Sequence, residues 1–462
     1  MPYQKGRVLV LAAALGLVAS AAPHAAEAQG EPASALVLGP PPVAEARATG
    51  REIAPARGRP EAREAPLVAC SFREPVCVHA PEATKPEVTL WTLRHAERAF
   101  GVLRALGLPE PLADQGLGGG PELDLYLLPG APGLTTATDL LPQGGGLDRQ
   151  SAFAVMSPPK SPRACEAQAD VTRAVATAGA LGLDAGAEAA LLSMVASYVS
   201  AIAATAVGCD LVELTAVDDF QRAPWRAVTS GTPDRPDGAL LFPWFLDDAY
   251  GRGNPGAVIT ALLAISAQRT APGAWEWSNE PDLFDALRAT MKDRGSTLDE
   301  LLLDFSVARA FVGDRSDEAH LRGAGSLGAF GRARFEWAVP LASLPRRLAP
   351  SAPIEATGAT YLWVDAAGGK PGDELAFVAD WELPALFRWA LIKIAPSGAE
   401  VGRVSVAGVY GDSHAERTVI GLEGLAGVLV VGVNAGSVDR AHPFDPDEMP
   451  LAPHGYTVTL AR

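Results

Sequence analysis

Histidine is scarce in this chain, which has seven histidines in 462 residues. No two of them stand four residues apart, the spacing at which one helical face presents two imidazoles to a metal ion. His95 and Glu97 are close in sequence but point to different faces of a helix, which is typical of a helix surface rather than of a metal site. The sequence therefore predicts no metal and no cofactor. The histidines beyond residue 28 are His79, His95, His320, His414, His442 and His454.

Long apolar runs are also missing. The longest covers residues 8–22, which is shorter than the roughly 20 residues that a membrane-spanning helix needs. It follows Lys5 and Arg7 and precedes the small residues Ala26-Glu27-Ala28, so residues 1–28 are interpreted as a cleavable signal peptide. We expect a secreted, periplasmic or envelope-associated protein, with no transmembrane anchor after cleavage. An uncleaved membrane anchor is the alternative.

Basic residues are outnumbered, because 38 Lys and Arg face 54 Asp and Glu, for a formal net charge of −16. Such a chain is a poor partner for nucleic acid or for an anionic membrane surface. The acidic residues are scattered rather than gathered in blocks, so the charge is interpreted as a source of solubility.

Only four cysteines occur, Cys70, Cys77, Cys165 and Cys209, and none forms a Cys-x-x-Cys pair that would indicate a zinc site. In an exported chain these cysteines are expected to form disulfides. Three connectivities are possible. We favour Cys70 with Cys77, which are close in sequence, and Cys165 with Cys209, which bracket a predicted helical hairpin.

Aromatic residues are almost absent from residues 29–66, which are rich in Ala, Pro, Glu and Arg. Such a segment buries too little apolar surface to offset its chain entropy, so it is predicted to be a disordered linker. The remainder is too long for one ordinary core and is divided into two domains, 67–320 and 330–462.

The first domain, residues 67–320, is predicted to be mixed α/β. Apolar residues at helical spacing predict a helix over 88–106, and residues 123–128 between Gly- and Pro-rich flanks predict a strand. Thr297 and Glu300 form a capping box at the start of the last helix. Further helices are predicted over 166–181, 187–206, 243–250, 257–268, 282–293 and 297–312.

The second domain, residues 330–462, follows a glycine-rich break at 323–331 and changes to period-two alternation. Short strands separated by turn residues are typical of a β-sandwich. The fold class is therefore α+β, with a mixed α/β domain followed by a C-terminal β-sandwich. The predicted strands are 335–341, 360–364, 375–381, 387–394, 402–407, 418–422, 427–433 and 456–460.

Two predicted helices, 166–181 and 187–206, resemble the active-site helices of a known protein family. The second contains Ser193-Met194-Val195-Ala196-Ser197-Tyr198, and the chain is similar here to secreted bacterial zinc-metallopeptidase-like proteins. That family has His-Glu-x-x-His on one helix and a Ser-Glu-Gly-x-Ala-x-Tyr-like pattern on the next. The resemblance implies the same mixed α/β fold for residues 67–320, in which 123–126, 242–251 and 298–314 look like family elements, and it makes the sandwich an accessory domain.

The zinc ligands of that pattern are absent from this chain. Thr172 and Ala176 fall on the two histidines, Arg173 on the glutamate and Met194 on the third ligand. Alanine has no lone pair, a threonine hydroxyl is a weak donor, and a thioether suits Cu(I) better than Zn(II). Arg173 stays protonated, so it cannot act as a base and would repel a cation. The same residues also fit the apolar stripes of an ordinary helical hairpin.

Three other patterns could carry function. Gly411-Asp412-Ser413 with Asp439-x-x-His442 imitates a serine esterase, but the spacing favours a turn. Residues 116–120 are glycine-rich but precede a strand and lack the Lys-Ser/Thr of a phosphate loop, so they indicate a plain loop. Trp363, Trp381 and Trp389 could bind sugar, although tryptophans on strands more often belong to a core.

We therefore expect a secreted metallopeptidase-like pseudoenzyme without catalytic residues, which acts by binding a peptide, a protein or a cell-envelope polysaccharide. The alternative is an active secreted hydrolase whose site is not recognised, either a metallopeptidase or a serine esterase that uses Ser413.

Overall fold

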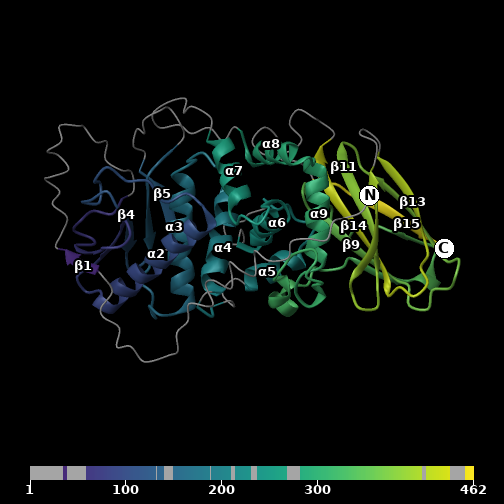
Figure 1. Ribbon diagram of the computed structural model, residues 1–462, viewed down its shortest axis with the longest axis horizontal. Coiled ribbons are helices and arrows are strands. Elements are labelled where there is room, and N and C mark those ends of the chain that lie inside the picture. The colour runs from purple at the N-terminus through teal and green to yellow at the C-terminus, as the bar shows by residue number, and fades with distance from the viewer. Residues whose placement is uncertain are drawn as a thin grey trace. The chain divides into compact units, whose positions relative to one another are not determined.

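The structure is a computed structural model of the chain (Figure 1). It describes residues 35–38, 59–131, 133–139, 149–187, 189–205, 207–209, 214–229, 237–267, 281–407, 413–437 and 453–462. The predicted signal peptide, 1–28, lies outside these residues. Among the described helices, none combines the length and the apolar character needed to cross a membrane.

The chain forms two compact units. The first comprises Met1–Glu188, Val195–Glu213 and Leu246–Pro281, and the second comprises Ala189–Met194, Leu214–Phe245 and Asp282–Arg462. Both helices and sheets are present, so the fold class is α+β as predicted. The compact units do not follow the expected boundary between 320 and 330, because residues 282–329 belong to the unit that contains the sandwich.

The first unit is built on one sheet with the strand order β1-β2-β3-β4-β6-β5. The central pairs, β3 with β4 and β4 with β6, are parallel, and the other pairs are antiparallel. Every residue of β3 and β4 is buried, as is usual for parallel strands covered on both faces. The strands are β1 (Ala35–Leu38), β2 (Leu67–Ser71), β3 (Val76–Ala80), β4 (Leu123–Leu127), β5 (Thr135–Thr138) and β6 (Ala152–Met156).

Helices α2 (Pro86–Leu106) and α3 (Cys165–Leu181) pack against each other, α2 beside β2 and β3 and α3 beside β5 and β6. Helix α3 consists largely of small residues, which allows close approach. A Cβ on Gly179 would lie 2.3 Å from the carbonyl oxygen of Pro109, so that position admits only glycine. The remaining helices of this unit are the second part of α4 (Ala189–Thr205), the end of α6 (Leu241–Tyr250) and α7 (Ala257–Ser266).

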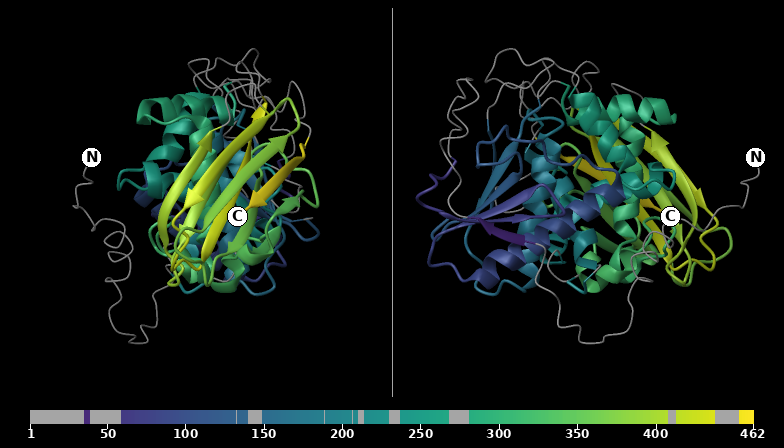
Figure 2. Two further views of the ribbon diagram at one scale, coloured as in Figure 1. Left: turned by 90° about the vertical axis from the view of Figure 1, so that its right-hand side faces the viewer. Right: turned by 60° about the vertical axis from the view of Figure 1, so that its left-hand side comes forward.

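The second unit contains the predicted β-sandwich, drawn in the yellow-green colours of Figures 1 and 2. One sheet has the order β13-β10-β15-β8 and the other β12-β11-β14-β9-β7. The two sheets share one apolar core, with Phe377 from the first and Trp389 from the second. A Cβ on Gly432 would lie 2.4 Å from the Trp389 ring, so glycine on the neighbouring strand makes room for this indole.

The sandwich strands are β7 (Trp337–Pro340), β8 (Arg346–Leu348), β9 (Ala359–Asp365), β10 (Glu374–Trp381), β11 (Ala385–Ile394), β12 (Glu400–Ala407), β13 (His414–Ile420), β14 (Gly427–Ser437) and β15 (Tyr456–Ala461). The period-two pattern predicts all of these except β8. It misplaces β13, for which we predicted 418–422, because the exposed edge strand has apolar residues only at wide intervals.

The five-stranded sheet is covered on both faces, which explains the long apolar runs of β11 and β14. One face meets the other sheet, and α9 (Leu298–Ala310) packs on the opposite face, beside β11 and β14 (Figure 1). Tyr361 of β9 donates to the carbonyl oxygen of Ser306 at 2.8 Å. The predicted capping box of Thr297 and Glu300 starts α9. The unit also holds α5 (Leu214–Arg222), α8 (Leu283–Arg294) and the 3-10 turns η2 (Asp237–Leu240), η3 (Gly313–Arg315), η4 (Ala324–Gly331) and η5 (Leu341–Ser343).

Two disulfides connect the four cysteines, Cys70 with Cys77 and Cys165 with Cys209, which is the pairing that we favoured. The first ties β2 to β3, and the second ties the start of α3 to the segment that follows α4.

The predicted disordered linker, 29–66, requires a correction in two places. Near its start, β1 (Ala35–Leu38) pairs antiparallel with β2, and the C-terminal end of the segment is also ordered. The Arg59 side chain is only 7% exposed and Ala65 is fully buried. The composition argument fails here because backbone pairing at β1 and the side chains of Arg59 and Ala65, rather than a broad apolar surface, attach this segment to the sheet.

Candidate functional site

The positions that the resemblance assigns to the zinc histidines, Thr172 and Ala176, are both only 1% exposed on α3. The Thr172 hydroxyl donates to the backbone carbonyl oxygen of Gln168, one turn earlier, at 2.8 Å. Met194, at the position of the third ligand, is 2% exposed on α4. These three side chains are packed as ordinary core residues, and none of them supplies an imidazole or a carboxylate.

Arg173, at the position of the catalytic glutamate, keeps part of its side chain in solvent. Its Nη1 lies 3.7 Å from Asp170 Oδ1, one turn earlier on α3. A guanidinium stays protonated and cannot take a proton from water. Among the residues that the structure describes, no group of three or more His, Cys, Asp or Glu side chains is arranged to hold a metal ion.

Tyr198, which the resemblance also singles out, takes part in a buried polar pair. Its hydroxyl donates to Asp247 Oδ2 at 2.7 Å, and the same oxygen accepts from the backbone N–H of Gly256 at 2.6 Å, at the start of α7. Burial raises the pKa of Asp247 and the pKa of Tyr198. The pair joins α4, α6 and α7 within the first unit.

The histidines within the described ranges do not gather at one site. His95 is buried, its Nε2 lies 2.8 Å from the carbonyl oxygen of Pro162, and burial lowers its pKa. The predicted surface position of His95 is therefore wrong, whereas Glu97 points elsewhere and accepts from Ser71. His414 contacts Asp380 on the surface of the four-stranded sheet, Nδ1 to Oδ1, at 2.7 Å.

The remaining predicted sites are structural or lie outside the described residues. Gly411, Asp412, Asp439 and His442 are outside, and the carbonyl oxygen of Ser413 accepts from the backbone N–H of Trp381. Residues 116–120 form a turn. Trp389 is fully buried and Trp381 is 6% exposed, so both belong to the sandwich core, and Trp363 is intermediate in exposure.

A polar cluster that the sequence analysis missed lies on one face of the first sheet. The register pairs His79 of β3 with Tyr126 of β4, and Asp124 with Phe153 of β6, so all four side chains share that face. The rings of His79 and Tyr126 stack with centroids 4.6 Å apart. Ala65 packs against Tyr126 and Phe153, which brings the preceding residues of the chain over this face.

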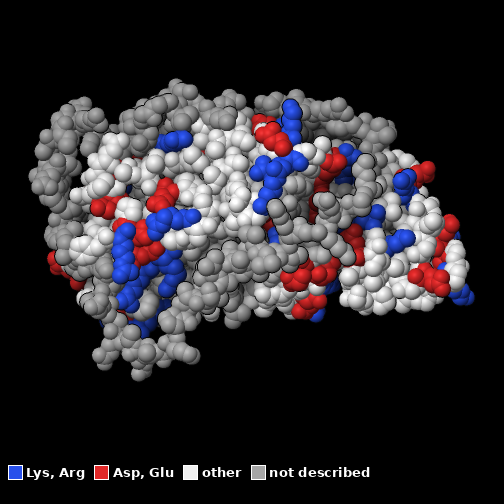
Figure 3. Space-filling view, viewed as in Figure 1, with Lys and Arg blue, Asp and Glu red and all other residues white. Residues whose placement is uncertain are grey.

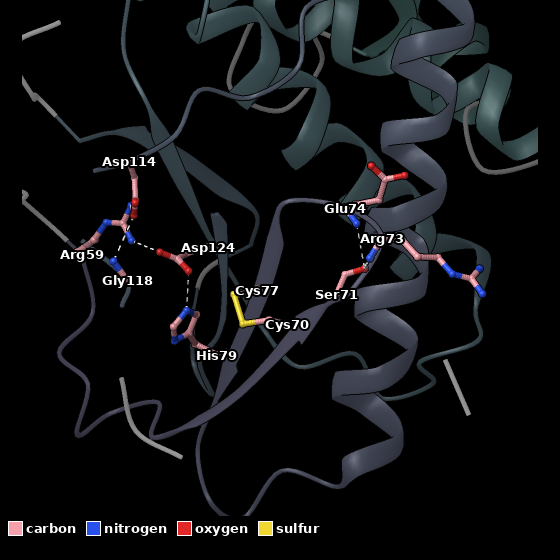
Figure 4. The surroundings of a disulfide bond; sticks show 10 residues. All are labelled: Arg59, Cys70, Ser71, Arg73, Glu74, Cys77, His79, Asp114, Gly118 and Asp124. Carbon is pink, nitrogen blue, oxygen red and sulfur yellow. Dashed lines mark hydrogen bonds and ion pairs between the residues drawn. A yellow bond between two sulfur atoms is a disulfide. The ribbon is translucent and has the colours of Figure 1, made fainter. Parts of the chain in front are cut away.

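Arg59 joins this cluster and lies beside Asp114 and Asp124 (Figure 4). Its Nη2 is 2.8 Å from Asp114 Oδ2, its Nε is 2.7 Å from Asp139 Oδ1, and its Nη1 pairs with Asp124. His79 Nε2 lies 2.6 Å from the other oxygen of Asp124. One signal in the sequence points here, because Asp124 stands in an otherwise apolar strand and a buried carboxylate requires a partner.

Acidic groups outnumber basic groups in this cluster, since three buried carboxylates surround one guanidinium. Burial raises the pKa of Asp114 to about 7, and the neighbouring carboxylates add to this although Arg59 opposes it. Burial would also raise the pKa of Asp124, but the bonds to His79 and Arg59 outweigh it and leave this pKa lowered. Near neutral pH, the Asp114 carboxyl group is therefore partly protonated.

The visible surface is mixed in charge. On the face drawn in Figure 3, basic and acidic side chains lie beside one another in mixed groups. No extended basic patch of the kind that tracks a phosphate backbone stands out among the described residues of that face.

No model of a known protein family matches this chain, and no curated protein matches it. Among solved structures, the pre-peptidase C-terminal domain of collagenase from Bacillus anthracis is 9% identical, with a TM-score of 0.19, over 28% of this chain and 98% of that one. The Yersinia pseudotuberculosis-derived mitogen is 12% identical, with a TM-score of 0.17, over 26% of this chain and 86% of that one. At such TM-scores neither likeness bears on fold or function.

Proposed function

We propose that this chain is a secreted, metallopeptidase-like protein that has no peptidase chemistry and acts by binding a polypeptide. The observation that carries the proposal is the burial of Thr172, Ala176 and Met194, which are at most 2% exposed and offer no imidazole or carboxylate to a zinc ion. A zinc hydrolase needs three protein ligands and an open position for water.

Export is supported by the leader-like pattern of residues 1–28 and by the two disulfides. Disulfides persist in oxidising compartments and are rare in the cytosol.

A polypeptide partner is favoured over a polysaccharide because two of the three tryptophans considered for sugar binding are buried. A sugar platform presents flat aromatic faces to solvent, whereas Trp389 is fully buried and the indole N–H of Trp381 donates to the carbonyl oxygen of Ala385 within the core.

The test is the metal content of the mature protein, purified without chelator and in the presence of zinc, by plasma mass spectrometry. We expect far less than one zinc per chain. We also expect no change in unfolding temperature when a chelator is added, because a metal bound only by the folded state would stabilise it. One zinc per chain, with a chelator-dependent loss of stability, would refute the proposal.

The alternative, a serine hydrolase that uses Ser413, is tested with a fluorophosphonate probe. We expect no labelling of the folded protein beyond that of a Ser413→Ala variant. Stoichiometric labelling that the variant abolishes would establish the alternative instead.

A further inference from the structure

The guanidinium of Arg59 has an acceptor for each of its five N–H bonds. Asp139 binds it with both oxygens, Oδ1 to Nε at 2.7 Å and Oδ2 to Nη2 at 2.9 Å. Nη2 also contacts Asp114 at 2.8 Å, and Nη1 contacts Asp124 and the Tyr126 hydroxyl, the latter at 3.3 Å. The guanidinium carbon lies 5.1 Å from the centre of the Phe153 ring. The arrangement matches the planar, five-donor shape of a guanidinium.

The acceptors are held in place by groups other than Arg59. Asp114 accepts from the backbone N–H groups of Gly116 and Gly118, at 2.8 and 3.2 Å. Asp124 is bonded by His79, and Asp139 accepts from the Ser151 hydroxyl at 2.8 Å. Each carboxylate therefore has a second partner that orients it, which is the condition for a site that exists before its ligand arrives.

The three aspartates around Arg59 need a bound cation to compensate their charge. The side chains of Asp114 and Asp139 are fully buried and that of Asp124 is 2% exposed, so without Arg59 their charges would be left without their main counter-charge. An ammonium group has three donors and no planar fork, so it would leave part of these oxygens unsatisfied. The geometry selects a guanidinium over other organic cations.

Arg59 reaches this site from a segment with few other attachments. Of residues 60–66, which join it to β2, only Ala65 is buried, and Glu61, Arg63 and Glu64 are exposed. The arginine is thus presented by a short peptide that lies on the sheet, in the manner of a bound ligand.

We propose that Asp114, Asp124 and Asp139, together with Tyr126 and Phe153, form an arginine-binding site that Arg59 fills within the same chain. An arginine side chain of another polypeptide takes this site when Arg59 is absent. The inference does not depend on descent from a peptidase, and zinc content has no bearing on it.

The experiment uses the full mature chain with Arg59→Ala. Methylguanidinium is added at millimolar concentration, with methylammonium at the same ionic strength as the control. We expect methylguanidinium to raise the unfolding temperature of the variant by several degrees and to leave the wild type unchanged, because a ligand of the folded state alone stabilises it. Equal shifts with both cations, or no shift, would overturn the proposal.

Binding in trans is measured by calorimetry with two peptides. Acetyl-Gly-Arg-Pro-amide has the sequence of residues 58–60, and acetyl-Gly-Lys-Pro-amide differs from it only in the central side chain. The Arg59→Ala variant should bind the arginine peptide at least about tenfold more tightly than the lysine peptide, the gain expected of a two-pronged charged bond. An Arg59→Ala, Asp139→Asn variant loses the two-pronged carboxylate and should lose this preference. Equal affinities for the two peptides would contradict an arginine site.

If the Arg59→Ala variant does not fold without a ligand, the experiment measures instead how much of it refolds from urea in the presence of each cation. Methylguanidinium should restore the yield and methylammonium should not. A variant that stays unfolded with both cations, or refolds equally with both, would count against the proposal.

Discussion

His320 and Glu400, 80 residues apart in sequence, are joined by a contact of 2.7 Å between Nε2 and Oε2. The other ring nitrogen, Nδ1, lies 2.9 Å from both oxygens of Asp317, and the ring stacks on Phe311 with centroids 3.9 Å apart. Arg403 also pairs with Glu400, at 2.8 Å. Both imidazole nitrogens therefore face carboxylates, which favour the doubly protonated ring and outweigh Arg403 Nη2, 3.2 Å from Nε2.

This contact makes the stability of the second unit dependent on pH. Burial lowers the pKa of His320, but the bonds to Glu400 and Asp317 outweigh it, and the net pKa is raised. The stabilisation is complete below the usual histidine pKa of about 6.5 and is lost as pH rises through the higher pKa of the folded state. We expect His320→Gln to cost about 1–3 kcal/mol at pH 6 and less at pH 8, measured by urea unfolding. A cost that does not change with pH would contradict this assignment.

The raised pKa of Asp114 should make the stability of the first unit depend on pH. This pKa rises from 3.8 to about 7 on folding, so the folded state binds this proton more tightly and stability falls as pH rises between these values. The slope is at most about 1.4 kcal/mol per pH unit for one proton. Asp114→Asn should flatten the curve of unfolding free energy between pH 4 and pH 7. The assignment fails if the variant and the wild type have parallel curves.

Arg309 is fully buried, and none of the described side chains bonded to its guanidinium is a carboxylate. Its Nε donates to Gln221 Oε1 at 2.7 Å, and a second nitrogen donates to the carbonyl oxygen of Phe220, whose ring lies 3.7 Å from the guanidinium carbon. Burial lowers the pKa of Arg309 to about 10. Arg309→Met leaves both acceptors unsatisfied, so we expect a loss of about 3 kcal/mol in chemical denaturation.

The matched control is Arg332→Met. The Arg332 side chain is more than half exposed, and it pairs with Asp314 on the surface. A surface pair contributes less than about 1 kcal/mol. Losses of similar size in the two variants would show that the buried contacts of Arg309 are not stabilising.

The two disulfides should contribute unequally. They close loops with sequence separations of 44 and 7 residues. On the chain-entropy estimate, Cys165→Ala with Cys209→Ala should cost about 4 kcal/mol, and Cys70→Ala with Cys77→Ala about 2 kcal/mol. Urea unfolding of the two double variants, each against the wild type, measures both costs. The reverse order would mean that the short bridge acts through the native hairpin rather than through the unfolded chain.

Local patterns predicted much of the fold. The capping box at Thr297 needs only two residues three positions apart, and the alternation of β10 follows from a strand with one buried face. Strand β8 was missed because three residues, two of them arginines, carry no detectable period. The compact units do not divide between residues 320 and 330 as expected. Helix α9 lies before that point in the sequence, but it packs on a sheet formed by residues far along the chain.

The candidate site was much harder to predict. Arg59 pairs with residues 65 and 80 positions away, and its own surroundings in the sequence resemble a linker. Nothing local distinguishes an arginine that docks in a buried site from one that stays in solvent. The oddity of Asp124 in an apolar strand could have indicated that a partner exists, but not which residue it is.

The sequence by itself determined which residue types stand at which spacing and most of the local elements, because both depend on residue identity and short-range pattern. It established that no histidine pair at helical spacing exists and that Thr172, Arg173 and Ala176 stand in α3. Only the tertiary structure decided which charged side chains pair with one another. The pairing of Arg59 with three aspartates and of His320 with Glu400 depends on strand register and chain crossover, which bring together residues that no local pattern relates.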